Sequence, residues 1–94
     1  MSHSLEIEYC RMCRWTLRAF WIAQEVLQTF DGDFSEVRML PTTGGHFKVR
    51  VNGEQVWCRV ADQGFPDVKI LKQRIRERID PQRDLGHIDR SSHS

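Results

Sequence analysis

The sequence predicts an α/β sandwich in which two helices pack on a four-stranded mixed sheet. Three observations lead to this prediction: short segments of alternating apolar and polar residues, a long helical segment directly after the first of them, and a second apolar helical stripe near the C-terminus. With 94 residues the chain has the length of one domain. We place this domain at residues 1–80 and expect residues 81–94, which are polar and lack periodicity, to form a flexible tail.

The first half of the chain predicts a strand, a helix and a second strand. Residues 5–9 alternate apolar and charged side chains, as in a strand with one buried face. Residues 14–30 contain no Gly or Pro and repeat apolar residues every three or four positions, which predicts a buried helix that ends near Gly32. Residues 34–40 predict the next strand, and a right-handed crossover places it parallel to the first.

The second half predicts a hairpin and a final helix. Residues 47–51 and 56–60 flank Asn52-Gly53, the strongest short-range signal for a hairpin. Pro66 is typical of the first turn of a helix, and Pro81 is typical of the point where a helix stops. The order strand–helix–strand–strand–strand–helix therefore combines a parallel pair with an antiparallel hairpin.

Composition and charge exclude several classes of protein. A formal net charge of +1 creates no field that would attract nucleic acid or a membrane surface. The longest apolar stretch, residues 19–23, is too short to span a bilayer, and the N-terminus lacks the basic and apolar segments of a secretory signal. An odd number of cysteines argues against a disulfide-braced secreted fold. We therefore expect a cytoplasmic protein with neither a nucleic-acid nor a membrane partner.

Cys10 and Cys13 form a Cys-x-x-Cys motif between the first predicted strand and the first predicted helix. In a cytosolic chain this position is typical of a thioredoxin-like redox motif. Backbone N–H groups at a helix N-terminus favour a thiolate, and such sites lower a cysteine pKa from about 8.5 to roughly 3.5–7.5. Arg11 and Arg14 add positive charge nearby. We therefore predict a redox-active centre in which Cys10 and Cys13 are catalytic and form a reversible disulfide bond.

Zinc binding and inert buried thiols are the alternatives to redox use. A structural zinc site needs two further ligands, and the candidates His46 and Cys58 stand singly without ligand spacing. We therefore expect no metal, and we predict that Cys58 is a small core residue of the return strand. Trp57 is predicted to lie on the opposite face of that strand, and Trp21 is predicted to be mostly in the core.

Three segments together carry a resemblance to a known family. They are Tyr9-Cys10-Arg11-Met12-Cys13, Thr43-Gly44-Gly45-His46-Phe47-Lys48-Val49 and Gly64-Phe65-Pro66-Asp67. This pattern resembles the selenoprotein W/T/H (Rdx) family, and most of all its short bacterial selenoprotein W-like members with Cys in place of selenocysteine. The resemblance implies a thioredoxin-like β-α-β-β-β-α fold and a redox role often linked to glutathione. Glutathione is then a candidate reductant and partner, beside a thiol or disulfide protein, and no bound cofactor is expected.

The resemblance leaves the attacking sulfur open. In the selenium-containing relatives the selenocysteine occupies the position that Cys13 matches, whereas in ordinary thioredoxins the first cysteine attacks. The chain also has no proline directly before Phe47, where thioredoxins place a cis-proline beside the dithiol. A threonine and glycine loop precedes Phe47 instead, and either it approaches the dithiol or it is a plain turn that needs two glycines. The residues expected to line the site are Arg11, Met12, Arg14, Thr43, Gly44 and Gly45.

The predicted function is thiol–disulfide exchange by an oxidoreductase that contributes to cell redox homeostasis. The alternative is a redox-sensing module that binds a protein partner without catalytic turnover. Both functions need a reactive thiolate, so the sequence alone separates them poorly.

Overall fold

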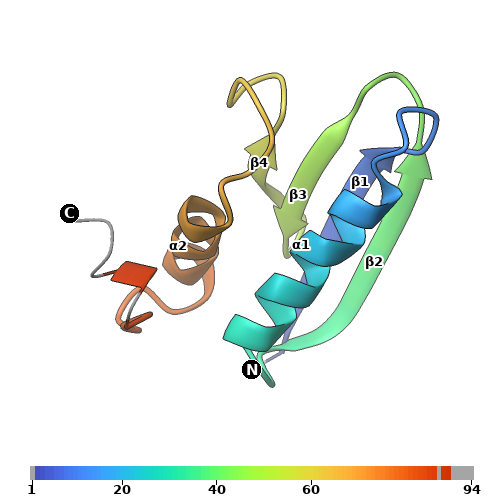
Figure 1. Cartoon of the computed structure of the whole chain (residues 1–94). Helices are drawn as coiled ribbons and strands as arrows, with labels where there is room; N and C mark the ends of the chain where they lie inside the picture. The colour runs from blue at the N-terminus through green and yellow to red at the C-terminus, as the bar shows by residue number, and fades with distance from the viewer. Residues whose placement is uncertain (1, 87, 90–94) are drawn as a thin grey trace.

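The sheet and its helices follow the predicted order along the chain. The structure, a computed structural model, describes residues 2–86, 88 and 89. Its elements are β1 (His3–Cys10), α1 (Thr16–Thr29), β2 (Phe34–Thr42), β3 (Phe47–Val51), β4 (Glu54–Cys58) and α2 (Val68–Ile79). The strand order across the sheet is β2-β1-β3-β4, with β1 parallel to β2 and antiparallel to β3 (Figure 1). The predicted α/β class with a four-stranded mixed sheet and two helices is confirmed.

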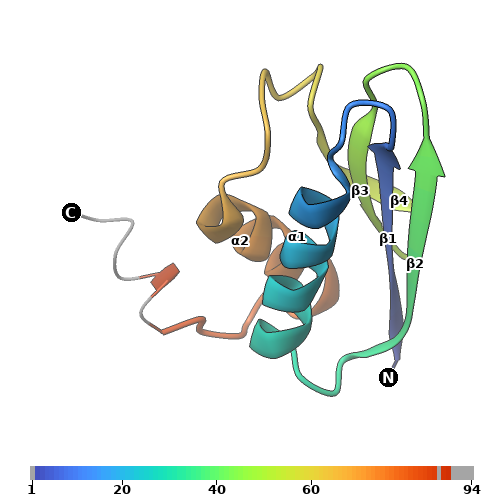
Figure 2. The ribbon, with the colours of Figure 1, turned by 45° about the vertical axis from the view of Figure 1, so that its right-hand side comes forward.

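Both helices lie on the same face of the sheet (Figure 2). Alternate residues of β1 point to that face, so that Leu5, Ile7 and Tyr9 are buried. Leu5 is paired with Val37 of β2 and with Val51 of β3, which continues the apolar layer across the sheet. The helices complete the core with the buried side chains Ala19, Ile22, Ala23, Val26, Leu71 and Ile75.

The opposite face of the sheet carries charged side chains. Arg50 of β3 donates one hydrogen bond to Glu6 at 2.5 Å and another to Glu8 at 2.7 Å. Glu6 also pairs with Arg38 of β2 at 3.1 Å. The hydrogen bond from Arg50 holds the pKa of Glu8 below its ordinary value. Alternating charge thus connects three neighbouring strands on this face.

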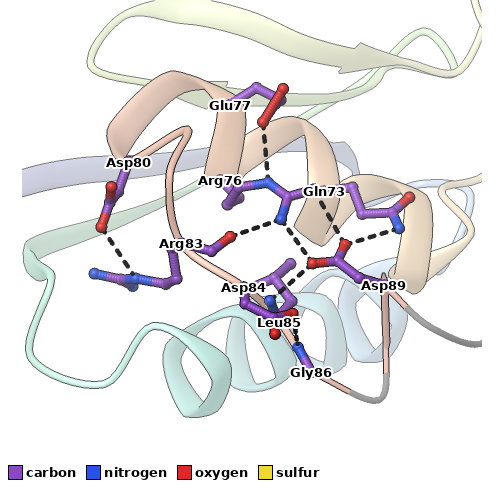
Figure 3. Close-up of polar contacts among 9 residues, drawn as sticks. All are labelled: Gln73, Arg76, Glu77, Asp80, Arg83, Asp84, Leu85, Gly86 and Asp89. Atoms are coloured by element: carbon purple, nitrogen blue, oxygen red, sulfur yellow. Dashed lines mark hydrogen bonds and ion pairs between the residues drawn. The ribbon is translucent and has the colours of Figure 1, made fainter.

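Part of the C-terminal segment is fixed to the domain by ion pairs (Figure 3). Arg76 of α2 donates to both carboxylate oxygens of Asp89, at 2.7 and 3.1 Å, and Asp89 also accepts a hydrogen bond from the backbone N–H of Leu85 at 2.8 Å. Arg83 makes a similar two-point contact with Asp33, at 2.6 and 3.2 Å. These contacts connect the segment to α2 and to the turn before β2.

The domain boundary at residue 80 and the flexibility of residues 81–94 stay predictions. Residues 87 and 90–94 of this segment lie outside the described residues. In the part of the chain that the structure describes, neither helix combines the length and the apolar character that crossing a membrane requires.

Three local expectations were wrong. Helix α1 begins at Thr16 instead of residue 14, because Arg14 has a φ of 62° and cannot continue a right-handed helix. Trp57 is buried with the helix-facing residues, because an irregularity beside Val49 pairs Trp57 with Val49 and breaks the alternation of β4. Trp21 is 51% exposed, on the side of α1 that lines a groove beside β2.

Candidate redox site

The two motif cysteines lie in the connection from β1 to α1. Cys10 ends β1, residues 11–14 form a turn, and α1 follows. The backbone N–H of Arg14 donates to the carbonyl of Arg11 at 3.1 Å, and the N–H of Arg11 donates to the carbonyl of Thr42 at 2.8 Å. The turn is therefore closed on itself and attached to β2. It brings the Cα atoms of Cys10 and Cys13 to 5.3 Å, which is within the range of disulfides.

The two sulfur atoms are at disulfide distance but differ in access to solvent. Cys10 is 1% exposed and is the last residue of β1. Cys13 lies in the exposed part of the turn. An external thiol or disulfide can therefore reach the sulfur of Cys13 far more easily than that of Cys10.

The N-terminus of α1 favours negative charge beside the turn. Trp15 is the N-cap residue, and its side chain makes no capping hydrogen bond among the described residues. The first turn of α1 also contains no acidic residue. The helix dipole is therefore not neutralised locally, and Cys13 precedes the N-cap by only two positions. This is an environment that stabilises a thiolate.

The loop between β2 and β3 lies at the same end of the sheet as the motif (Figure 1). Thr42 is the register partner of Cys10, and its hydroxyl donates to the carbonyl of Tyr9 at 3.1 Å. Gly44 and Gly45 follow with φ angles of 84° and 75°, a region that favours glycine. The loop thus adjoins Cys10. The positive φ angles alone are enough to explain why glycines stand at positions 44 and 45.

The predicted lining residues fall into two groups. Arg11, Met12 and Arg14 are exposed in the motif turn, and Met12 is 68% exposed with its sulfur 3.5 Å from the Arg11 guanidinium. Thr43 and Gly44 are exposed in the neighbouring loop. The fold places both groups at one end of the sheet, while their part in binding or catalysis stays a prediction.

An aromatic cluster behind the motif was not predicted as part of the site. The ring of Trp15 meets Phe65 edge-on at 4.8 Å and Phe47 at 6.3 Å. Two guanidinium groups cover these rings, with Arg18 4.1 Å from the centre of Phe65 and Arg59 5.2 Å from that of Trp15. Phe65 stands in the Gly-Phe-Pro-Asp segment, whose pattern alone indicates only a helix start. Phe65 itself was the feature of the sequence from which a packing contact with Trp15 could have been predicted.

Among the described residues, no three His, Cys, Asp or Glu side chains gather closely enough to hold a metal ion. Cys58 is a free, buried thiol in β4, as predicted for a core residue.

Comparison with known proteins assigns the chain to a family. Residues 4–77 match the model of the Rdx family. The crystal structure of a selenoprotein W-related protein from Vibrio cholerae superimposes with a TM-score of 0.82 and 46% identity, covering 85% of this chain and 100% of that one. A Bordetella parapertussis protein superimposes with a TM-score of 0.80 and 47% identity, covering 83% of this chain and 99% of that one.

Curated mammalian relatives are more distant and longer. Migration and invasion enhancer 1 from Mus musculus is 31% identical over 70 residues, which are 74% of this chain. The Bos taurus protein of the same name gives the same identity over the same length. The matched region is 59% of the length of each relative. The family match, the structural neighbours and the paired motif cysteines agree on one assignment: the chain belongs to the Rdx family, with the thioredoxin-like fold of selenoprotein W-related proteins.

Proposed function

We propose that this protein is a thiol–disulfide oxidoreductase in which Cys13 attacks the substrate and Cys10 resolves the intermediate. The difference in access between the two paired sulfurs carries this proposal: Cys13 is exposed, whereas Cys10 is 1% exposed at the end of β1. An attacking sulfur must meet a substrate, but a resolving sulfur needs to meet only its neighbour.

The reaction proceeds by two exchanges that balance in atoms and electrons. The Cys13 thiolate attacks one sulfur of a substrate disulfide, the other substrate sulfur leaves as a thiolate, and a mixed disulfide on Cys13 remains. Cys10 then loses its proton and attacks the Cys13 sulfur, which releases the second substrate thiolate and forms the Cys10–Cys13 disulfide. The substrate gains two electrons, and the dithiol loses two electrons and two protons.

Glutathione is the proposed reductant that returns the disulfide to the dithiol. Two molecules of this thiol supply the two electrons and become glutathione disulfide. The carboxylates of glutathione complement the guanidinium groups of Arg11 and Arg14, which are exposed in the motif turn. The proposed setting is the cytoplasm, where glutathione keeps thiols reduced, and the proposed substrate is a disulfide of another protein.

Single cysteine variants test the two roles. The probe is a mixed disulfide of glutathione and a chromophoric aryl thiol, whose release is followed by absorbance. Cys10→Ser should release the aryl thiol and keep a glutathione adduct on Cys13, located by peptide mass spectrometry. Cys13→Ser should react at least about tenfold more slowly, because the remaining sulfur is buried. Cys58→Ala, which leaves the motif intact, is the matched control and should behave like the wild type.

The outcomes separate three cases. An adduct that forms equally fast on Cys10 in Cys13→Ser contradicts the assigned roles, and absence of an adduct in both variants contradicts the redox function. Turnover is tested with the wild type, glutathione and glutathione reductase. Continued consumption of reductant that needs both cysteines supports an enzyme, whereas one equivalent of oxidation without turnover supports a redox sensor.

A further inference from the structure

An apolar groove lies between α1 and β2, outside the redox site. Its volume is about 640 Å³, and it is lined mostly by apolar side chains. Leu17 and Trp21 of α1 contribute although they are 86% and 51% exposed, and Val37 and Met39 contribute from β2. Large apolar side chains gathered in one exposed place mark an interaction surface.

The strand below this groove is an edge of the sheet. β2 is the first strand in the order β2-β1-β3-β4, and the described residues place no strand on its outer side (Figure 1). The unpaired backbone N–H and C=O groups of an edge strand can pair with a strand of another chain. The groove and the free edge are thus adjacent parts of one surface.

The charge pattern of β2 is complementary to itself. Glu36 and Arg38 are exposed on either side of Val37 and share the face opposite the helices. In antiparallel pairing of two β2 strands with Val37 on the two-fold axis, each Glu36 lies opposite the Arg38 of the other copy. An axis through residue 36 or residue 38 would instead place two like charges opposite each other. The axis through Val37 is therefore the favoured register.

We propose that β2 and the groove beside it form a symmetric dimer interface in which two copies of this chain build one continuous sheet about Val37. A two-fold axis perpendicular to the sheet keeps the helices of both copies on one face, beside each other (compare Figure 2). The exposed apolar side chains of the two α1 helices, Leu17 and Trp21 among them, then face each other across the axis. The two Cys10–Cys13 motifs lie at opposite ends of the joined strands and stay open to substrate. The dimer is thus independent of the redox function.

Charge reversal on β2 tests the register. The full chain is studied by sedimentation velocity over a wide concentration range, and the wild type should show reversible dimers. Glu36→Arg gives two arginines on each strand and Arg38→Glu gives two glutamates, so each single variant should raise the dimer dissociation constant about tenfold or more. The double variant E36R/R38E restores opposite charges across the axis and should regain most of the affinity that the single variants lose, although it still lacks the ion pair of Arg38 with Glu6.

A mixing experiment supplies the sharpest control. Equal amounts of E36R and R38E should form a mixed dimer, because residues 36 and 38 of one strand then each meet an opposite charge on the other. The tryptophan fluorescence of the protein should shift to shorter wavelength as the dimer forms, because Trp21 becomes covered. A wild type that is monomeric up to millimolar concentration overturns the proposal and leaves the edge to another occupant, such as an extended peptide. A dimer that neither the reversals nor the mixture affects also overturns it. Dithiol exchange is measured on the same samples and should not change, so failure of the dimer is distinguishable from failure of the redox function.

Discussion

At the scale of single residues, left-handed backbone angles surround the dithiol. Arg14 has a φ of 62° and Gly44 a φ of 84°. For a residue with a side chain, this conformation costs roughly 1–2 kcal/mol, so the turn after Cys13 is held by its surroundings. For Gly44 the cost is absent. Both the β1–α1 connection and the β2–β3 loop therefore use a left-handed residue. In the first it is a strained arginine, and in the second it is an unstrained glycine.

Substitution of Gly44 tests whether its loop does more than turn. Gly44→Ala should lower the free energy of unfolding by about 1 kcal/mol, because alanine is strained at this φ. A Cβ atom there would lie 3.4 Å from the imidazole of His46, which can move away. We expect an unchanged rate of exchange with a small disulfide. Urea denaturation and the exchange assay provide the measurements.

Gly53→Ala is the matched control for this prediction. Gly53 has a φ of 83° in the β3–β4 turn, and a Cβ atom added to it would meet nothing within 4 Å. Both variants should lose similar stability. A slower exchange in Gly44→Ala alone would show that the loop contacts the substrate.

The sequence predicted the position of the cysteine motif correctly, but it did not predict the burial of Trp57 or the exposure of Trp21. The position of Cys10 and Cys13 follows from a strand pattern that runs directly into the motif. The burial of Trp57 depends on an irregular pairing between β3 and β4, which leaves no mark in the alternation of the sequence. The exposure of Trp21 depends on which side of α1 the rest of the fold leaves uncovered. The burial of Trp57 and the exposure of Trp21 both depend on how the elements pack together, and the local periodicity of the sequence does not report that packing.

At the scale of elements, ion pairs connect the C-terminal segment to α2 (Figure 3). The two hydrogen bonds from Arg76 hold the pKa of Asp89 well below its ordinary value. A carboxyl with a lowered pKa stabilises the folded state above its unfolded pKa of 3.8, and this stabilisation is lost as the pH falls through the folded pKa. The attachment should therefore persist throughout the neutral and mildly acidic range.

Asp89→Asn should loosen this attachment without unfolding the sheet. The amide keeps the shape of the carboxylate but loses the charge that Arg76 recognises. We expect faster hydrogen exchange at the backbone N–H of Leu85, which donates to Asp89, and unchanged exchange in β1. Glu77→Gln is the control, because Glu77 is an exposed partner of the same arginine. If exchange at Leu85 stays slow in Asp89→Asn, the ion pair does not hold the segment.

The elements themselves were largely predictable, and their ends were less so. Alternation predicted β1 and β3, because each of these strands buries one face and period two survives in the sequence. The return strand was predicted at residues 56–60, but β4 is Glu54–Cys58 and its last three residues are all buried. The start of α1 was placed two residues early, because apolar periodicity does not report the left-handed angle at Arg14. The contact of Arg83 with Asp33 joins positions that are far apart in the chain, and polar composition gives no hint of such a partner.

At the scale of the whole molecule, the sheet divides the protein into an apolar side and a charged side. The helices cover the apolar side, and on the other side Arg50 connects Glu6 and Glu8 of the central strand β1. Their side chains are only 17–23% exposed, so solvent screens these pairs less than it screens surface ion pairs. Charge on this face therefore contributes to the stability of the sheet as a unit.

Arg50→Gln should make the stability of the protein less dependent on pH. At pH 7 we expect a loss of about 1–2 kcal/mol in the free energy of unfolding, because two carboxylates lose a charged hydrogen-bond donor. The pKa of Glu8 is lowered in the fold mainly by this donor, so the contribution is present above pH 4.5 and disappears as the pH falls through the folded pKa. Urea denaturation at several pH values should show the free energies of unfolding of wild type and variant converging in acid.

Lys48→Gln is the control, because it removes only a minor influence on Glu8, and it should lower the free energy of unfolding less than Arg50→Gln at every pH. A difference between wild type and Arg50→Gln that stays constant into acid would mean that Arg50 acts by packing its aliphatic stem rather than by its charge.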